Sequence, residues 1–318
     1  MNSDLITAFN LRKKLDLSKT TAFRALHRGE WQSLDVSVEI YGNWFLIWSY
    51  QASPKSQKLL DELVELVVTT YHSLGGVIKF PQKNPHEKGL ISVQKVVLEK
   101  PPTWFTVQEK GIQFEVTLTE KQHTGLFLDQ RDNRRWVFEN SRGTRVANLF
   151  CFTSSFSVAA ILGGAESVHS VDIAKSVLKW SEKNLALNNI ENLNANKRAF
   201  FYCDDVRQWL KRQENKIVKD PSLKFDLIIC DPPTFASGDK KHGVFDVEKE
   251  WAALVESCKK IANPNAQFLF STNFQNTNIS KLLKPLSLTF KEVKIISPPI
   301  DFPVLKNSPI FTHYFLCR

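Results

Sequence analysis

The residues best suited to chemistry in this chain form the stretch Asp231-Pro232-Pro233-Thr234-Phe235, which directly follows the apolar run 225–230. A run of that length and hydrophobicity predicts a strand buried on both faces of a parallel sheet. The two prolines end the strand, so Asp231 would lie at its carboxyl end, where open α/β sheets bind ligands. This turn could bind a planar base, because it combines rigid carbonyls, a carboxylate and the ring of Phe235. Taken alone, however, the stretch is also compatible with an ordinary turn.

Acidic residues end two earlier predicted strands in the same way. One strand ends with Asp172 and Ile173, and an acid there can accept hydrogen bonds from both hydroxyls of a ribose. The next ends with Asp204 and Asp205, ahead of Val206, and one of these acids could meet an adenine amino group. Asp205 could equally be a helix N-cap. A single such acid is readily explained as a helix cap, but polar groups at the ends of four consecutive strands are not.

The first strand of this series runs into a loop and a helix start, where a nucleotide-like ligand lies against the helix amino terminus. The candidate cofactor contacts in this segment are Asn148, Phe150, Phe152, Thr153 and Ser154. The chain has no Gly-x-Gly-x-x-Gly motif, which disfavours a dinucleotide and favours a cofactor without a pyrophosphate. S-adenosylmethionine fits that description.

The elements that must position these residues alternate between strand and helix from Arg145 onward. The expected strands are 145–150, 167–173, 198–203, 225–230 and 267–271, and the expected helices are 156–162, 174–187, 206–213 and 247–261. Such alternation predicts right-handed βαβ units and a parallel sheet with helices on both faces. The last two strands, 289–296 and 312–317, are separated by a proline-rich loop without a helix. They should therefore pair as a hairpin, which makes one strand antiparallel.

The part of the chain before residue 121 follows a different pattern. Residues 31–120 predict a small α+β domain with probable RNA contacts, built from strands at 34–40, 44–50, 90–98, 104–108 and 112–119 and a helix at 56–74. Ahead of it, residues 1–30 form a basic extension in which the segments 11–14 and 19–28 place six Lys or Arg on expected helices. This basic face is either an ordinary solvated surface or a surface that follows phosphates. The third domain is 121–318.

Composition is that of an ordinary globular protein, with 42% hydrophobic and 24% charged residues among 318. A formal net charge of +9 and a pI near 9.2 favour a polyanionic partner. The five cysteines are widely spaced and form no Cys-x-x-Cys pair, so we expect neither a metal site nor a disulfide framework. No window approaches the roughly 18 apolar residues of a membrane span, and the first residues lack a basic segment leading into an apolar one. We therefore expect a cytoplasmic protein.

Several segments together resemble class I S-adenosylmethionine-dependent RNA methyltransferases, most closely the C-terminal guanine-N7 module of the bifunctional bacterial 23S ribosomal RNA methyltransferases. The resemblance rests on 123–131 with Arg134, 148–165, Val171-Asp172 with Trp180 and 184–188, 231–235 with 245–247, and 36–50. The resemblance covers about residues 10–318. The order of the segments along the chain identifies the family more specifically than any single segment does. The resemblance implies a Rossmann-like fold with a mostly parallel seven-stranded sheet and one antiparallel strand, preceded by a small α+β domain.

The resemblance also implies a role for individual residues. The loop from Phe150 to Ser155 would bind the methionine part of the cofactor, Asp172 its ribose and Asp205 its adenine, and Asp231 would lie beside the transferred methyl. The segment 124–134 would cover the cofactor, which adds Phe127, Asp129 and Arg131 to its contacts. The catalytic set is Asp231, Pro232, Pro233 and Phe235, and the basic residues expected near phosphates are Arg131, Arg134, Arg135, Lys240 and Lys241.

One departure from the family concerns Ser154. The family usually has glycine there, because the backbone must pass close to the ligand or adopt a positive φ. A serine at this position leaves the affinity for the cofactor open.

The residue types near the site also bear on which atom is methylated. Methylation of pyrimidine C5 needs a cysteine thiolate, and the two places where related enzymes carry it hold Thr234 and the triplet 271–273, so cytosine C5 is disfavoured. Guanine N7 has an in-plane lone pair and no proton to remove. Alignment within about 3 to 3.5 Å and exclusion of water would therefore suffice. An exocyclic amine of guanine or adenine stays open as the target.

We accordingly expect methyl transfer from S-adenosylmethionine to a guanine, at N7, in large-subunit ribosomal RNA. Two hypotheses of other classes stay open. One is a noncatalytic RNA-binding protein that kept the fold and lost cofactor affinity through Ser154. The other is a methyltransferase for small molecules or proteins, which would leave the +9 charge unexplained.

Overall fold

The computed structural model describes residues 3–51, 54–81, 93–190, 198–236, 243–273, 279–305 and 312–318. The chain divides into two compact units. The first comprises Met1–Arg131 with Pro299–Ser308, and the second comprises Asp132–Pro298 with Pro309–Arg318. A segment near the carboxyl end thus returns to the first unit.

The first unit is built on a five-stranded sheet in the order β1-β2-β3-β4-β5 and a separate two-stranded sheet of β6 and β7. Its elements are α1 Ser3–Arg12, β1 Ala22–Leu26, β2 Val36–Tyr41, β3 Trp44–Ser49, α2 Pro54–Tyr71, β4 Gly75–Phe80, β5 Val93–Leu98, β6 Phe105–Glu109, β7 Ile112–Val116 and the short 3-10 helix η1 Leu128–Gln130. Strands β3 and β4 pair in parallel through the crossover helix α2, and the other neighbours are antiparallel. The expected hairpins β2-β3 and β6-β7 are confirmed.

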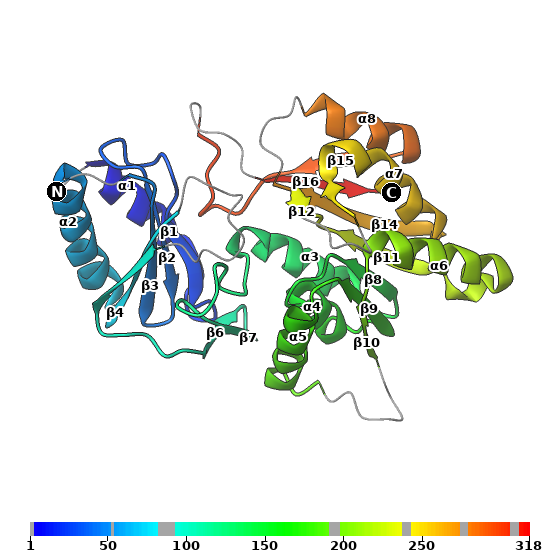
Figure 1. The fold of residues 1–318 in the computed structure, drawn as a ribbon, viewed down its shortest axis with the longest axis horizontal. Coiled ribbons are helices and arrows are strands. Elements are labelled where there is room, and N and C mark those ends of the chain that lie inside the picture. Colours follow the sequence, from blue (N-terminus) through cyan, green and yellow to red (C-terminus); the bar gives the residue numbers. More distant parts are fainter. Residues whose placement is uncertain are drawn as a thin grey trace. The chain divides into compact units, whose positions relative to one another are not determined.

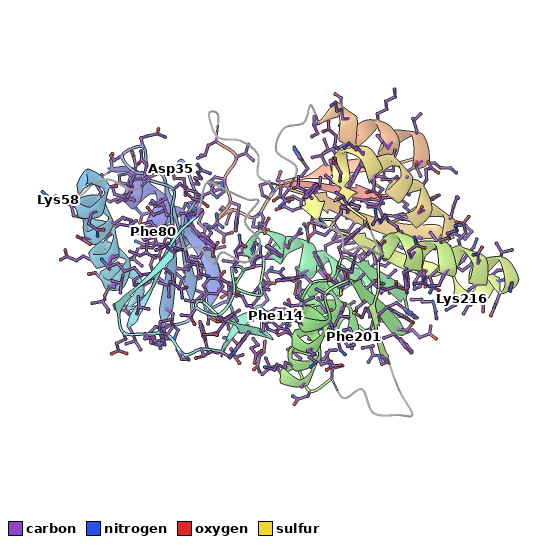
Figure 2. The ribbon with its side chains drawn as sticks, in the orientation of Figure 1. Asp35, Lys58, Phe80, Phe114, Phe201 and Lys216 are labelled. Atoms are coloured by element: carbon purple, nitrogen blue, oxygen red, sulfur yellow. The ribbon has the colours of Figure 1, made fainter. Side chains whose placement is uncertain are left out.

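The core of the first unit lies between the five-stranded sheet and its helices. Leu60, Leu63 and Val67 recur at helical spacing on α2, so they share one face, and all three are buried against the strands. Lys58 is exposed on the same helix, which lies along one face of the sheet (Figures 1 and 2). Phe9 of α1 joins the same core.

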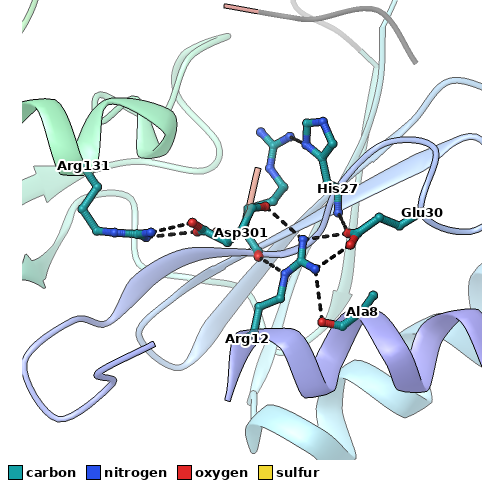
Figure 3. A network of polar contacts seen from close by, with 7 residues as sticks. Ala8, Arg12, His27, Glu30, Arg131 and Asp301 are labelled. Carbon is teal, nitrogen blue, oxygen red and sulfur yellow. Dashed lines mark hydrogen bonds and ion pairs between the residues drawn. The ribbon is translucent and has the colours of Figure 1, made fainter. Parts of the chain in front are cut away.

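A buried ionic network ties the returning segment to this unit (Figure 3). Asp301 is fully buried, and its carboxylate accepts two hydrogen bonds from the guanidinium of Arg131 and one from the backbone N–H of Arg24 at 3.0 Å. The backbone carbonyl of Asp301 accepts a bond from Arg12 at 2.9 Å. Arg12 also donates two bonds of 2.7 Å to the carboxylate of Glu30. Residues far apart in sequence are therefore held by one set of paired charges.

The expectation of a helix over 19–28 is wrong, because Ala22–Leu26 form the edge strand β1, paired with β2. Phe23 and Leu26 are buried in the core, and this tertiary contact outweighs a weak helical tendency. The basic side chains of the segment are also paired, Arg24 with Glu39 and Arg28 with Asp35. These charges therefore serve the fold of the first unit.

The second unit is built on a seven-stranded sheet in the order β10-β9-β8-β11-β14-β16-β15. Its strands are β8 Arg145–Leu149, β9 Ser167–Asp172, β10 Ala199–Cys203, β11 Phe225–Cys230, β14 Ala262–Thr272, β15 Val293–Ile296 and β16 His313–Cys317, with a two-stranded sheet of β12 Phe235–Ala236 and β13 Phe245–Asp246. The strands from β10 to β14 pair in parallel, and β16 runs antiparallel to both β14 and β15, which confirms the predicted topology and its closing hairpin.

Helices cover both faces of this sheet (Figure 1). They are α3 Arg131–Asn140, α4 Ser155–Leu162, α5 Lys175–Leu187, α6 Val206–Lys219, α7 Val247–Lys260 and α8 Ser280–Thr289, with the short 3-10 helix η2 Pro221–Leu223. Helices α6, α7 and α8 bury Trp209, Trp251 and Leu286 against the sheet. The strand–helix alternation from β8 to β14 is as expected. The sequence pattern missed α3 and α8, and α8 contains Pro285, which disfavours a helix interior.

The network around Asp301 leads to a stability prediction. Replacing Asp301 by Ala removes the carboxylate that pairs with the buried guanidinium of Arg131, and breaking a buried ion pair in this way costs about 3 to 5 kcal/mol. We expect a loss of that size in the free energy of unfolding, measured with urea. Arg135→Ala serves as the control, because its pair with Glu139 is exposed and should contribute less than about 1 kcal/mol. Equal effects of the two substitutions would contradict this account.

A second prediction concerns His169 of β9, whose ring stacks on Phe200 with centroids 4.7 Å apart and whose Nδ1 lies 3.0 Å from the hydroxyl of Tyr202. Burial, with a smaller contribution from nearby positive charge, lowers the pKa of His169 from 6.5 to about 3. The folded state keeps the ring neutral, whereas the unfolded chain takes up a proton below about pH 6.5. The stability present above that pH is therefore lost as the pH falls from about 6.5 toward about 3.

Between pH 7 and pH 5 this one group should lower the free energy of unfolding by about 2 kcal/mol. His169→Phe keeps an aromatic ring in the stack without a titrating group. Urea unfolding at the two pH values should show that the difference shrinks by about that amount in the variant. His27, whose pKa burial also lowers to about 3, titrates in both proteins and cancels from the comparison. An unchanged pH difference would refute the assignment.

Candidate active site

The loop between β8 and α4 has an uncommon backbone. Three of its residues adopt the left-handed conformation with side chains present, with φ of 58° at Phe150, 49° at Phe152 and 60° at Ser154. Each such residue costs on the order of 1 to 2 kcal/mol, so the surroundings must hold the loop. Two buried side chains of α5 do so: Ser181 donates to the carbonyl of Phe152 at 3.1 Å and Asn184 to that of Thr153 at 2.9 Å.

Asp172, the last residue of β9, faces this loop. One carboxylate oxygen accepts the backbone N–H of Phe152 at 2.9 Å and the other accepts that of Ala174 at 2.9 Å. Burial raises the pKa of Asp172, and the backbone hydrogen bonds counteract that rise. A carboxylate offers about four acceptor positions, so capacity remains for a diol. The next residue, Ile173, exposes an apolar side chain at the same edge.

The two acids after β10 have protein partners. Asp205 caps α6 by accepting the backbone N–H of Arg207 at 2.8 Å, and it pairs with the guanidinium of that residue at 2.6 Å. Burial by itself raises the pKa of Asp205, but the contacts with Arg207 outweigh it and the pKa lies below its usual value. Arg207 also pairs with Glu250. Asp204 pairs with Arg212, and Val206 is buried in the core. The N-cap role considered for Asp205 is thus present.

The turn after β11 is fixed from the neighbouring strand. The hydroxyl of Ser271 donates to the carboxylate of Asp231 at 2.6 Å, and the hydroxyl of Thr234 donates to the side-chain oxygen of Asn273 at 2.5 Å. The following residue, Phe235, pairs with Asp246 in the β12-β13 sheet and keeps 59% of its surface exposed. Pro232 is buried and Pro233 is exposed. A held carboxylate and an open aromatic ring therefore lie within one turn.

Aromatic contacts link this turn to the cofactor loop within the second unit. Phe245 of β13 lies with its ring centroid 5.3 Å from that of Phe150, and Phe152 contacts Trp180 of α5. The backbone N–H of Asp231 points to the carbonyl of Leu149, at 3.5 Å. The predicted residues at the ends of β8, β9 and β11 thus come together at one sheet edge.

The predicted residues from the segment 124–134 have other surroundings. Phe127 is exposed and Asp129 is half-buried at η1, and both belong to the first unit. Arg131 is 3% exposed and paired with Asp301. Their cofactor role stays a prediction.

The structure argues against two of the five basic residues expected near phosphates. Arg131 and Arg134 are buried, with 3% and 1% of their surfaces exposed, so their guanidinium groups are not offered to an RNA backbone. Arg135 is exposed, although it pairs with Glu139. Lys240 and Lys241 lie outside the described residues.

Asn148, predicted as a cofactor contact, has a hydrogen bond within the core, and several residues that support the site were not predicted. Asn148 is 1% exposed and donates to Ser157 at 2.8 Å, which places it beneath the site as a core hydrogen-bonding residue. Ser181, Ser271 and Asn273 carried no prediction of their own. A signal was present for Ser181, because polar residues at 181 and 184 share the apolar face of α5.

The chemistry of these residues suits S-adenosylmethionine. Asp172 offers acceptor positions for a ribose, Ile173 offers an exposed apolar surface for a base, and the left-handed loop presents backbone groups beside α4. The hydroxyl of Ser154 is buried, and among the described residues it has no hydrogen-bond partner.

Searches for a metal site and for a membrane span gave no candidate. The described residues contain no group of three or more His, Cys, Asp or Glu side chains placed to hold a metal ion. None of the helices in the described ranges combines the length and the apolar character needed to span a membrane.

Comparisons with known proteins show the family to which the chain belongs. A family model of S-adenosylmethionine-dependent methyltransferases matches residues 91–281. The chain is 33% identical over 245 residues to the ribosomal RNA large subunit methyltransferase K/L of Hahella chejuensis, which covers 76% of this chain and 32% of that protein. It is 32% identical over 298 residues to the protein of that name from Shewanella pealeana, covering 91% of this chain and 40% of that one. The chain thus spans less than half the length of these relatives.

Solved structures show the same fold. SMU.776, described as a methyltransferase and solved in complex with SAH, is 27% identical with a TM-score of 0.80, over 99% of this chain and 82% of that one. A SAM-dependent methyltransferase from Agrobacterium tumefaciens has a TM-score of 0.68 at 16% identity, over 94% of this chain and 90% of that one. The second likeness concerns the fold alone.

The backbone of Ser154 leads to a prediction. Ser154→Gly removes the cost of a left-handed residue with a side chain and also removes the buried hydroxyl. We expect the free energy of unfolding to rise by about 1 kcal/mol and S-adenosylmethionine to bind at least as tightly, measured by calorimetry. Binding weakened more than about tenfold would instead show that the hydroxyl itself contacts the cofactor.

Proposed function

This chain belongs to the S-adenosylmethionine-dependent methyltransferase family, and we propose that it transfers a methyl group to a guanine of large-subunit ribosomal RNA, at N7. The observation that carries the proposal is the turn from Asp231 to Phe235, which combines a held carboxylate with an exposed aromatic ring at the carboxyl edge of the parallel sheet. Open α/β sheets bind their ligands at this edge.

The residues that would hold the cofactor come from three strands. Asp172 would accept hydrogen bonds from the ribose, Ile173 and Val206 would lie beside the adenine with Asp205, and the loop from Phe150 to Ser154 would receive the methionine part. When bound, S-adenosylmethionine supplies a methyl group on a positively charged sulfur, which the lone pair of guanine N7 can accept without loss of a proton. Asp231 would then hold its place beside the methyl through its bond from Ser271.

Two features support a guanine N7 as the acceptor. No general base is needed for this atom. Phe235, whose backbone is held by its pairing with Asp246, is largely exposed, so its ring would be available to stack on a planar base. A base stacked on an aromatic ring in this way gains about 1 to 3 kcal/mol. Cysteine, the nucleophile for C5 methylation, stands neither at 234 nor at 271–273.

The RNA substrate is supported from two directions. The relatives from Hahella and Shewanella are named as ribosomal RNA large subunit methyltransferases. The net charge of +9 favours a polyanion, and the dependence of binding on salt would report how many phosphates are neutralised.

The test is methyl transfer from S-adenosylmethionine to unmodified 23S ribosomal RNA by the purified chain, with the product identified by nucleoside mass spectrometry. We expect 7-methylguanosine, and we expect Asp231→Ala to lower the rate by about 100-fold while cofactor affinity changes little. Asp220→Ala is the matched control, since Asp220 caps η2 away from the turn. Transfer by Asp231→Ala at the normal rate would refute the role of the turn, and a different methylated nucleoside would refute the target atom.

A further inference from the structure

Two side chains at the carboxyl end of β14 hold the turn after β11. Ser271 donates to Asp231 at 2.6 Å, and Asn273 accepts from Thr234 at 2.5 Å. The strands are parallel and Cys230 pairs with Phe270, so Asp231 and Ser271 are the next residues of each strand in that register. The contacts therefore follow from the sheet itself.

The hydrogen bond from Thr234 determines what Asn273 offers to a ligand. Its side-chain oxygen accepts the hydroxyl proton of Thr234. This bond orients the planar amide, so that the nitrogen with its two N–H donors is directed away from Thr234 and toward a further contact. Asn273 is exposed, and Thr234 directly precedes the exposed ring of Phe235. Thr234 is thus hydrogen-bonded to an exposed amide and is followed in the chain by an exposed aromatic residue.

Hydrogen-bond donors in this position would distinguish guanine from adenine. The edge of guanine that carries N7 also carries O6, and both atoms accept hydrogen bonds, whereas adenine has an amino donor in place of O6. An amide N–H that faces this edge can donate a hydrogen bond to O6 of guanine. On adenine it would face the amino group, which is itself a donor. The hydrogen bond from Thr234 directs the amide oxygen toward that residue, which disfavours the flipped amide orientation that adenine would need.

We propose that Asn273 determines base specificity by donating a hydrogen bond from its amide nitrogen to O6 of the guanine whose N7 is methylated, and that Thr234 fixes the orientation of the amide. The inference rests on the proposed function and adds the residue that selects the base. Thr234 acts through Asn273 and is a positioning residue.

The first test compares Asn273→Asp with the unaltered protein on an unmodified 23S ribosomal RNA transcript. The substitution keeps the size of the side chain and the acceptor for Thr234 while replacing both donors by a carboxylate. We expect kcat/KM for formation of 7-methylguanosine to fall by about 10- to 100-fold, with S-adenosylmethionine affinity within about twofold. Asn140→Asp on α3, where the amide bonds only a helix carbonyl among the described residues, is the matched control and should keep full activity.

The second test separates base selection from a general defect. Once the methylated nucleotide is mapped, synthetic RNA hairpins with guanine or 2-aminopurine at that position are compared, because 2-aminopurine keeps N7 and lacks O6. The unaltered protein should prefer guanine by about 10-fold or more, and Asn273→Ala should lose most of that preference. Thr234→Val, which frees the amide to rotate, should reduce the preference partly.

The outcomes separate the two proposals. Absence of 7-methylguanosine with the unaltered protein refutes the proposed function. Normal formation of that product together with an unchanged guanine preference in Asn273→Ala refutes the role of Asn273 alone. If Asn273→Asp loses cofactor binding, Asn273→Ala and Thr234→Val on the paired hairpins still decide the question.

Discussion

The candidate site depends on the common register of the parallel strands at their carboxyl ends. The pairings Cys203 with Asp172, Leu149 with Val171, and Cys230 with both Leu149 and Phe270 align five strands. The row at or just beyond the strand ends is therefore Cys203, Asp172, Phe150, Asp231 and Ser271. A slip of one residue in any strand would turn its last side chain to the other face and remove it from the site. The largely buried interiors of β8, β9 and β11 enforce this register.

The loop after β8 shows how the rest of the unit supports that edge. Three left-handed residues together oppose folding by several kcal/mol. Hydrogen bonds to the loop offset this cost. Ser181 and Asn184 of α5 donate to loop carbonyls, and the carboxylate of Asp172 accepts the N–H of Phe152. Asp172 therefore holds the loop as well as offering acceptors to a ligand. Partial burial raises the pKa of Asp172, and the backbone hydrogen bonds through which it holds the loop counteract that rise.

The sequence predicted the second unit well and the first unit less well, for a physical reason. Apolar runs such as 225–230 report burial on both faces, and prolines or acids at their ends report the sheet edge, so Asp172 and Asp231 could be found.

Arg131 was placed near phosphates because its buried partner, Asp301, lies 170 residues away in the chain, where no local pattern indicates a pair. Arg24 and Arg28 likewise looked like a solvated basic face until Glu39 and Asp35 were seen beside them. Asn273 could not be found either, since its importance comes from the hydroxyl of Thr234 on the adjacent strand.

If the acceptor is guanine N7 as proposed, the site has to align the reacting atoms and has no proton to move. A reaction at an atom without a proton needs groups that stay in one position, and hydrogen bonds across neighbouring strands provide this at Asp231 and Asn273. The buried histidines have a different role: His27 and His169 are kept neutral within packed aromatic and ionic surroundings that belong to the fold. Their titration weakens folding in acid without taking part in transfer. Acid sensitivity of the protein and the chemistry of its site therefore arise from separate groups.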